Sequence, residues 1–142
     1  MGKSIARRVL GAAAWIGSVA LALGIGTAIG ESVPPKENKG VRIGEPVILD
    51  LAPWADDMRG RQLRIRRFDI EPGGVTGIHS HDDRPDVSYL VRGTLTEFRP
   101  DSSSQSRASE TLHAAGKGVT HWVANRGSTP AVLIVADIFK PQ

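Results

Sequence analysis

The sequence predicts an all-β protein on three observations. From residue 47 onward, short segments rich in Val, Ile, Leu, Phe and Thr alternate with turns rich in Gly, Pro, Asn and Asp. No window in this part shows the periodicity of an amphipathic helix. The segments are short and closely spaced, which is typical of a β-sandwich or a β-barrel.

Each strand is expected where strand-forming residues lie between two turn signals. Arg92-Gly93 is interpreted as a two-residue hairpin turn, EPGG (71–74) as a turn and the polar stretch 99–109 as a hairpin loop. The loop 52–62 carries Trp54, which is expected to cap the core. The expected strands are 47–51, 63–70, 75–81, 87–92, 94–98, 110–114, 119–125 and 131–139.

The segment LRIRRFDI (63–70) leaves one point open, because its first two and last two apolar residues lie on opposite faces of an ideal strand. A bulge near Arg66-Arg67 would put all four on one face of the sheet. Without a bulge, Arg67 is expected to point into the protein. The sequence does not decide between these two arrangements.

Residues 1–30 are interpreted as a signal peptide or a membrane anchor. The segment begins with the basic stretch MGKSIARR and carries no charge from Val9 to Gly30. We favour a cleaved signal peptide, because the small residues Ala28 and Gly30 offer a cleavage site before Glu31. The rest of the chain is then expected to be exported, to a bacterial periplasm.

The remainder of the chain is expected to hold one folded domain. The polar segment 31–46, which contains three prolines, is interpreted as a linker or an extended arm. Residues 47–142 are interpreted as a single β-barrel domain, and a chain of 142 residues is long enough for one domain with a core.

Charge and cysteine content exclude several functions. The formal net charge is +3, and without the three cations of residues 1–30 the chain has 15 Lys plus Arg against 15 Asp plus Glu. A neutral domain is a poor candidate for nucleic-acid binding, so no nucleic-acid partner is expected. Contact with a membrane is expected only through an uncleaved N-terminal segment. The absence of cysteine excludes disulfides, thiolate catalysis and Cys-ligated metal sites.

His79 and His81 are the first candidates for a metal site. Alternate residues of a strand face the same side, so the two imidazoles would project together. Asp82, Asp83 and Asp86 follow closely and add oxygen ligands to the ring nitrogens. This mixture suits iron, manganese, nickel, cobalt or zinc better than calcium or magnesium. The plainer alternative is an exposed polar face or a single structural hydrogen bond.

The spacing of these residues resembles the first motif of the cupin superfamily. That motif consists of glycine, five residues, His-x-His, three or four residues, glutamate, six residues and glycine. Gly73, His79, His81, Asp86 and Gly93 reproduce this spacing, with aspartate in the position of glutamate.

A second segment resembles the second cupin motif, which ends in glycine, two residues, histidine, three residues and asparagine. Gly118, His121 and Asn125 match this half of the motif. Two positions depart from the pattern: Glu110 stands where the motif has its leading glycine, and Gly116 stands where it has proline.

The resemblance covers residues 45–140 and implies a cupin barrel, a jelly roll also called a double-stranded β-helix, that binds one divalent transition metal such as iron, manganese, nickel or zinc. The implied ligands are His79, His81, Asp86 and His121. Burying these groups without a partner would be costly, and one ion satisfies all of them. Because aspartate is shorter than glutamate, two alternatives stay open: three histidines with water, or Asp82 or Asp83 in place of Asp86.

Strand alternation predicts what surrounds the metal. The residues that share the inward parity of the ligands are Ser88, Leu90 and Val123. The pocket is therefore expected to be mostly apolar, with Tyr89 facing away from it. His113 lies outside both motifs and is expected at the surface.

The sequence leaves three functions open: a metal-dependent enzyme, a non-catalytic binding module, and a structural protein whose site is empty. A redox-capable metal with apolar walls suits a dioxygenase that acts on a small organic substrate. The alternative is a non-catalytic module that binds a metal or a small ligand, because the fold does not select among functions. No catalytic residue is assigned, although Arg67, Glu97 and Asp137 are candidates for a general base. The outward face expected for the last strand, with Leu133 and Val135, would allow a homodimer.

Overall fold

The computed structural model describes residues 33–100 and 102–141. The expected signal peptide or anchor, residues 1–30, lies outside these residues. None of the helices in the described part is long and apolar enough to cross a membrane. This part consists of strands and turns with one short 3₁₀ helix, η2 (Asp56–Met58), so the all-β prediction is confirmed.

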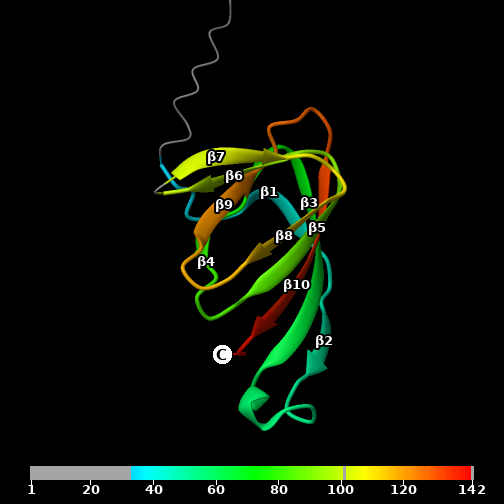
Figure 1. Ribbon diagram of the computed structural model, residues 1–142. Helices are drawn as coiled ribbons and strands as arrows, with labels where there is room; N and C mark the ends of the chain where they lie inside the picture. The colour runs from blue at the N-terminus through cyan, green and yellow to red at the C-terminus, as the bar shows by residue number, and fades with distance from the viewer. Residues whose placement is uncertain (1–32, 101, 142) are drawn as a thin grey trace, which may run out of the picture. The chain divides into compact units, whose positions relative to one another are not determined.

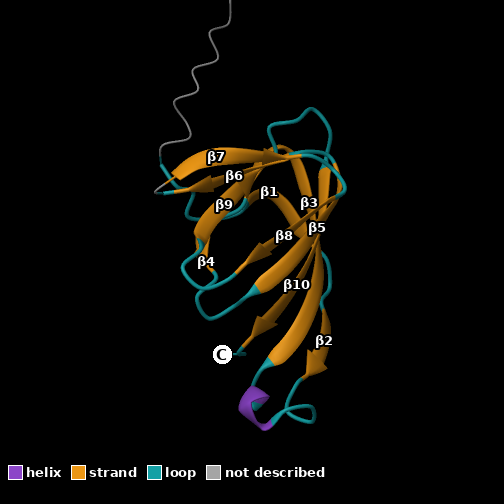
Figure 2. Ribbon diagram, viewed as in Figure 1, coloured by secondary structure: helices purple, strands orange, loops and turns teal. Residues whose placement is uncertain are grey.

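In the described residues ten strands form the sheet, and β3 is much the longest of them (Figure 2). Their bounds are β1 (Lys39–Ile43), β2 (Val47–Asp50), β3 (Gln62–Val75), β4 (His79–Ser80), β5 (Asp86–Arg92), β6 (Leu95–Arg99), β7 (Ser102–Arg107), β8 (Thr111–Ala115), β9 (Thr120–Ala124) and β10 (Ala131–Phe139). The main path runs in the order β7-β6-β9-β3-β10-β5-β8, while β1 and β2 pair with β3 and β4 pairs with β9. Every pairing is antiparallel.

The sheet curls because β3 belongs to both of its halves. The strand pairs with β10 from Gln62 to Ile70, and its last residue, Val75, pairs with Ala124 of β9. Figure 1 shows the result, with β6, β7 and β9 above and β5 and β10 below. The strand continues through residues 71–74, where a turn was predicted. The curl brings the two halves of the sheet to face each other around an interior.

The chain crosses between these halves at Gly93, and the predicted hairpin at this point is wrong. β5 pairs with β10 and β8, whereas β6 pairs with β9 and β7. Glycine is required at position 93 for two reasons. Its φ is +84°, and an added Cβ would lie 2.8 Å from the Cα of Ala131. The turn at Arg92-Gly93 therefore carries the chain from one half of the sheet to the other.

The folded part begins earlier than the sequence predicts. Residues 39–43, inside the expected linker or arm, form β1 and pair with β3. The two strands approach so closely that a Cβ on Gly74 would lie 2.7 Å from the carbonyl oxygen of Gly40. The segment is thus an extended arm whose strand belongs to the sheet, and β3 supplies the partner that its short polar sequence does not reveal.

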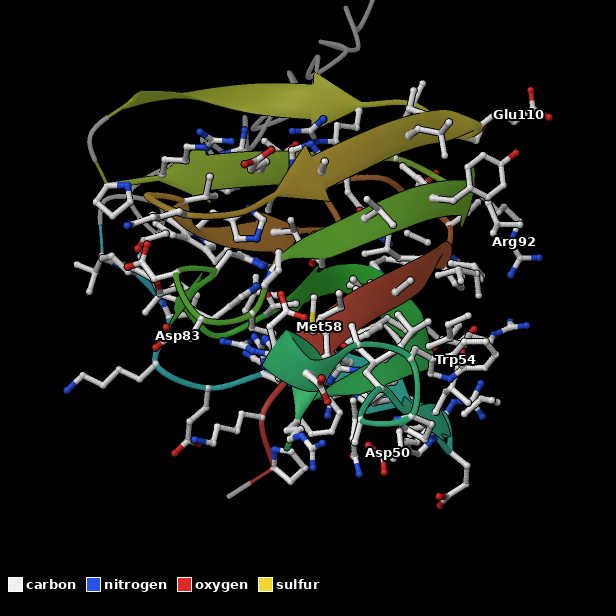
Figure 3. The ribbon with its side chains drawn as sticks, turned by 60° about the horizontal axis from the view of Figure 1, so that its bottom comes forward. Asp50, Trp54, Met58, Asp83, Arg92 and Glu110 are labelled. Atoms are coloured by element: carbon white, nitrogen blue, oxygen red, sulfur yellow. The ribbon has the colours of Figure 1, made fainter. Side chains whose placement is uncertain are left out.

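One segment and one side chain differ from the sequence prediction, and one residue has an unusual backbone conformation. Residues 102–107, expected in a loop, form β7 and pair with β6. Trp54, expected to cap the core, is 74% exposed and lies at the periphery of the molecule (Figure 3). Glu110, also labelled in Figure 3, has a φ of +65°, a backbone conformation that favours glycine. Glu110 stands where the second cupin motif carries glycine.

The apolar core consists of two clusters. Ile70, Leu90, Leu95 and Ala131 form the first, in the region where β3, β5, β6 and β10 meet. Phe98, Trp122 and Ala124 form the second on β6 and β9, where the rings of Phe98 and Trp122 stack with centroids 5.3 Å apart. Together these clusters hold β9 and β6 in place, and these strands carry groups of the candidate site.

Candidate metal centre

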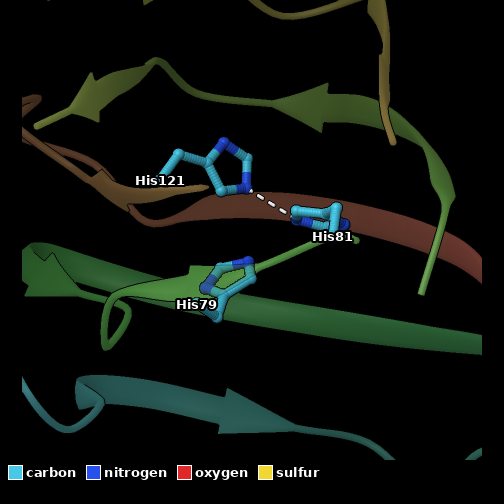
Figure 4. A group of neighbouring side chains, drawn as sticks. All are labelled: His79, His81 and His121. Carbon is cyan, nitrogen blue, oxygen red and sulfur yellow. Dashed lines mark hydrogen bonds between the residues drawn. The ribbon is translucent and has the colours of Figure 1, made fainter. Parts of the chain in front are cut away.

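Three histidines meet in the interior of the curled sheet (Figure 4). His79 on β4 lies directly opposite His121 on β9, and His81 follows β4 by one residue. The three ring centroids lie 4.8–4.9 Å apart. His81 and His121 are buried, and His79 is half-buried. The short β4–β9 ladder therefore brings together imidazoles that are 40 residues apart in the chain.

An oxygen acceptor fixes the Nδ1 atom of each of these histidines. The Nδ1 atoms of His79 and His81 lie 2.9 Å and 3.0 Å from the carbonyl oxygens of Gly77 and Arg84. The Nδ1 atom of His121 lies 3.0 Å from Glu97 Oε1. Carbonyl and carboxylate oxygens only accept, so each Nδ1–H donates and the proton is absent from Nε2. All three rings thus have a free lone pair on Nε2.

A cation between these lone pairs would stabilise the cluster. The Nε2 atoms of His81 and His121 lie 2.9 Å apart, and the dashed line in Figure 4 joins them. Two acceptors at this distance repel each other, and burial lowers the pKa of His81, which opposes protonation. Two nitrogens bound at right angles to one ion, each about 2.1 Å from it, would be about 3 Å apart. The donor set therefore fits a divalent transition metal.

Glu97 is the carboxylate that orients His121. Its side chain is 3% exposed, and Arg99 and Arg107 both donate to it. Burial alone would raise the pKa of Glu97, but the hydrogen bonds from His121 and the two arginines hold it well below its usual range. The sequence names Glu97 only as a possible base. A lone acid inside the strand LTEFR was the signal for a buried, partnered carboxylate.

Asp86 reaches the cavity but does not join the histidines. Its Oδ2 lies 3.6 Å from Nδ1 of His81, on the side of the ring opposite the Nε2 cluster. Its Oδ1 is buried without a hydrogen-bond partner, and burial raises its pKa. Among the described residues, the group of mutually close ligand atoms that contains His79 and His81 is completed by His121 and contains no carboxylate.

Asp82 and Asp83 do not replace Asp86 in this group. Both are exposed, and Asp82 Oδ1 accepts a hydrogen bond of 2.6 Å from the backbone N–H of Gly118. This bond ties the loop after β4 to the turn before β9. The structure thus favours the arrangement of three histidines that the sequence left open, with Asp82 holding the two histidine-bearing segments together.

The structure contradicts the surface position expected for His113. The side chain is 17% exposed and lines the cavity, with Nε2 3.7 Å from Glu97 Oε2. This Nε2 is buried without a hydrogen-bond partner, and burial lowers the pKa of the ring. Register explains the difference: His113 lies opposite Ser88, an inward residue, while its neighbour Leu112 is 80% exposed. Parity separated the two faces correctly but did not say which one is inside.

A cavity of about 440 Å³ adjoins the three histidines and includes the expected pocket residues Ser88, Leu90 and Val123 in its wall. The register aligns the inward side chains of β3, β10, β5 and β8 into three rows. The ionic row contains Arg64, Asp137, Asp86 and Ala115, the mixed row Arg66, Val135, Ser88 and His113, and the apolar row Phe68, Leu133, Leu90 and Thr111. The cavity is therefore apolar at one end and charged at the other.

These rows settle two expectations about strand faces. No register shift interrupts the pairing of β3 with β10, so no bulge forms there, and Arg66 rather than Arg67 lines the cavity. Arg67 points outward and pairs with Asp69. Leu133 and Val135, expected on an outward face that a second copy would contact, line the cavity instead. Phe68 and Arg66 face the cavity from β3, and their partners on β10, Leu133 and Val135, therefore face it too.

The metal-free protein is expected to lose stability as the pH falls from about 6.5 to about 4. Burial lowers the pKa of His79 from 6.5 to about 4. In this range the unfolded chain binds a proton on His79 that the folded chain does not, so the stabilisation is complete above the upper value and is lost towards the lower one. Urea denaturation of chelator-treated protein near pH 7 and near pH 4.5 measures this loss.

The variant His79→Gln is the control, and its loss of stability over the same range should be smaller. Asp86, whose pKa is raised by burial, titrates in the opposite sense in both proteins. An equal loss in the two proteins would contradict the assignment to His79.

Comparison with known proteins supports the cupin fold. No protein-family model matches the chain. Two curated plant proteins match about half of it: germin-like protein 8-14 of Oryza sativa is 30% identical over 84 residues, and germin-like protein subfamily 2 member 1 of Arabidopsis thaliana is 32% identical over 78 residues. The matches cover 56% and 52% of this chain, and only 39% and 36% of those proteins.

Solved structures with the same fold cover more of the chain. A predicted oxalate decarboxylase from Thermotoga maritima matches 76% of this chain and 95% of its own, with a TM-score of 0.51 and 18% identity. An oxalate oxidase in complex with glycolate matches 76% of this chain and 54% of its own, with a TM-score of 0.50 and 23% identity. A protein with a double-stranded β-helix domain from Klebsiella pneumoniae matches 53% and 65%, with a TM-score of 0.50 and 16% identity.

The fold and the three-histidine cluster define a small β protein of the jelly-roll class, built around an interior site. The chain has the fold of these cupin proteins, and the spacing of its two histidine motifs resembles that of the superfamily.

Proposed function

We propose that this protein is a mononuclear metal cupin in which His79, His81 and His121 hold one divalent transition metal, and that it acts as a dioxygenase on a small organic molecule. One observation supports the metal site above all others: one ligand nitrogen of each ring lies within 4.8 Å of the other two, and an acceptor holds the Nδ1–H of each ring. Such outer partners are typical of histidines that bind metals, because they fix the tautomer and the orientation of the ring.

The residues of the site have separable tasks in this proposal. The histidines supply three ligands, which leaves coordination positions for a substrate, and Glu97 keeps His121 in the required tautomer. The apolar row with Phe68, Leu133 and Leu90 excludes water from one end of the cavity and gives an organic substrate a surface to contact. A bound transition metal would supply a Lewis acid and, if it is redox-active, a centre for dioxygen chemistry.

The choice of substrate starts from the solved relatives. One of them is an oxalate oxidase and another a predicted oxalate decarboxylase, so oxalate belongs in a first substrate panel with other small organic acids and phenols. The chain spans about two fifths of the length of the curated relatives it matches, and their whole activities do not follow from the shared part.

The test uses protein reconstituted separately with iron, manganese, nickel and zinc. We expect the iron or manganese form to consume dioxygen with at least one member of the panel, while metal-free protein does not. The ferrous form should also bind nitric oxide and give an iron–nitrosyl EPR signal, which reports an open coordination position without any knowledge of the substrate. A metal-loaded protein that neither binds nitric oxide nor consumes dioxygen would instead be the non-catalytic binding module.

A further inference from the structure

One carboxylate in the ionic row faces three arginines. Asp137 is 1% exposed, and its oxygens lie 2.7 Å from Arg64 Nη2, 2.9 Å from Arg66 Nη2 and 3.7 Å from Arg84 Nε. Burial alone would raise the pKa of Asp137, but these guanidinium groups lower it, so its charge is fixed. Three positive groups against one negative group leave an excess of positive charge in a region where charge is costly to bury.

The excess lies on the two arginines that face the cavity. Arg64 directs both Nε and Nη2 at Asp137, and its Cζ lies 3.9 Å from the centre of the Phe139 ring, so it is well partnered. Arg66 and Arg84 line the cavity instead. The Cζ of Arg66 lies 5.0 Å from the centre of the Phe68 ring, but Asp137 engages only its Nη2, and its Nε is buried without an acceptor. Burial also lowers the pKa of Arg66, a sign that its charge is poorly compensated.

The acids that line the cavity do not compensate these arginines. Glu97 is occupied by His121, Arg99 and Arg107. Asp86 directs Oδ2 towards His81 and has no partner at Oδ1. Lys36 and Glu37 also line the cavity, and as a pair they add no net charge.

The strand register shows which side chains an anionic ligand bound at Arg66 would also contact. Arg66 belongs to the mixed row, and the apolar row of Phe68, Leu133 and Leu90 is the next row along the strands. Adjacent inward rows are separated by about 7 Å, roughly the length of a small organic acid. A carboxylate is also the anion that the planar guanidinium fork matches best.

We infer that Arg66, assisted by Arg84, is the carboxylate-recognition point of this cavity, so that its ligand is a small organic acid with an apolar body. The inference deepens the proposed function, because it concerns the ligand of the same cavity. It does not require the metal, and binding to metal-free protein therefore tests it separately.

The experiment measures binding of benzoate and of benzamide, its neutral counterpart, to metal-free protein by isothermal titration calorimetry in a chloride-free buffer. The wild-type protein is expected to bind benzoate at least about tenfold more tightly than benzamide, because a hydrogen bond between charged groups is lost with the amide. Arg66→Gln should abolish this preference, and Arg66→Lys should restore part of it. Arg67→Gln is the matched control, since Arg67 is the next residue of β3 but faces outward.

The outcomes separate this inference from the proposed function. Arg66→Gln should still bind one equivalent of metal when loaded, because Arg66 contacts none of the three histidines, and its circular dichroism should remain that of a β protein. Equal binding of benzoate and benzamide, or a preference that survives in Arg66→Gln, would overturn the inference while leaving the metal site standing. Inorganic sulfate bound as tightly as benzoate would overturn the assignment to organic acids.

Discussion

The variant His121→Ala is expected to bind divalent metal at least about 100-fold more weakly than the wild-type protein. The substitution removes one of the three proposed ligands and also leaves Glu97 without the ring that it orients. After dialysis against metal-free buffer, elemental analysis should find about one metal ion per wild-type chain and less than about a tenth of that in the variant. The variant should keep its β-rich circular dichroism, because the strands are held by backbone pairing and by two apolar clusters.

The control for this experiment is His113→Ala. His113 lines the same cavity, but it lies outside the group formed by His79, His81 and His121. We expect this variant to retain its metal. Equal metal content in His121→Ala and the wild-type protein, or an equally large loss in His113→Ala, would show that the ligands have been assigned wrongly.

Replacing Asp137 with alanine is expected to destabilise the fold by about 3–5 kcal/mol, the cost of breaking a buried ion pair by removing one partner. Asp137 is 1% exposed, and the side chains of Arg64 and Arg66 that it neutralises are 16% and 15% exposed. Without it, these guanidinium groups stay in the interior with no carboxylate. Urea denaturation of the metal-free protein at neutral pH measures the change.

Asp56→Ala provides the comparison for Asp137→Ala. Asp56 pairs with Arg59 at 2.8 Å, but both side chains are largely exposed, at 91% and 75%. Its removal should change the free energy of unfolding by less than about 0.5 kcal/mol, because surface ion pairs contribute little. Similar effects of the two substitutions would mean that Asp137 holds no essential charge balance.

The histidine cluster could be predicted because it depends on local rules. Strand alternation places His79 and His81 on one side, and the motif spacing adds His121 from β9. The same rules did not predict how far the short side chain of Asp86 reaches. Asp86 lies at the expected position and faces the cavity, yet its carboxylate lies at His81 Nδ1 and outside the Nε2 cluster. At this position the motif predicted the inward direction of Asp86 but not how far its carboxylate reaches.

The cavity wall was harder to predict, because it depends on which parity of each strand is inside. In β3 both parities carry apolar residues and arginines, so the pattern was ambiguous. Pairing with β10 resolved it and placed Arg66 inward. The same problem affected His113, whose direction follows from its partner Ser88 rather than from its own segment. Register is a long-range property, and single segments do not contain it.

The layer change at Gly93 shows a third limit. A glycine with positive φ between two strands is also typical of a hairpin, and the local sequence does not distinguish the two outcomes. The pairing partners make the difference. β10 and β8 occupy the two edges of β5, so β6 pairs with β9 instead of β5. Long-range pairing of this kind is what turns a series of short strands into a jelly roll.

Anomalous diffraction from crystals of the metal-loaded protein would test the histidine site directly. We expect one strong peak per chain, within about 2.3 Å of the Nε2 atoms of His79, His81 and His121. A peak bound elsewhere, or an interior without a peak in protein that contains one equivalent of metal, would contradict it.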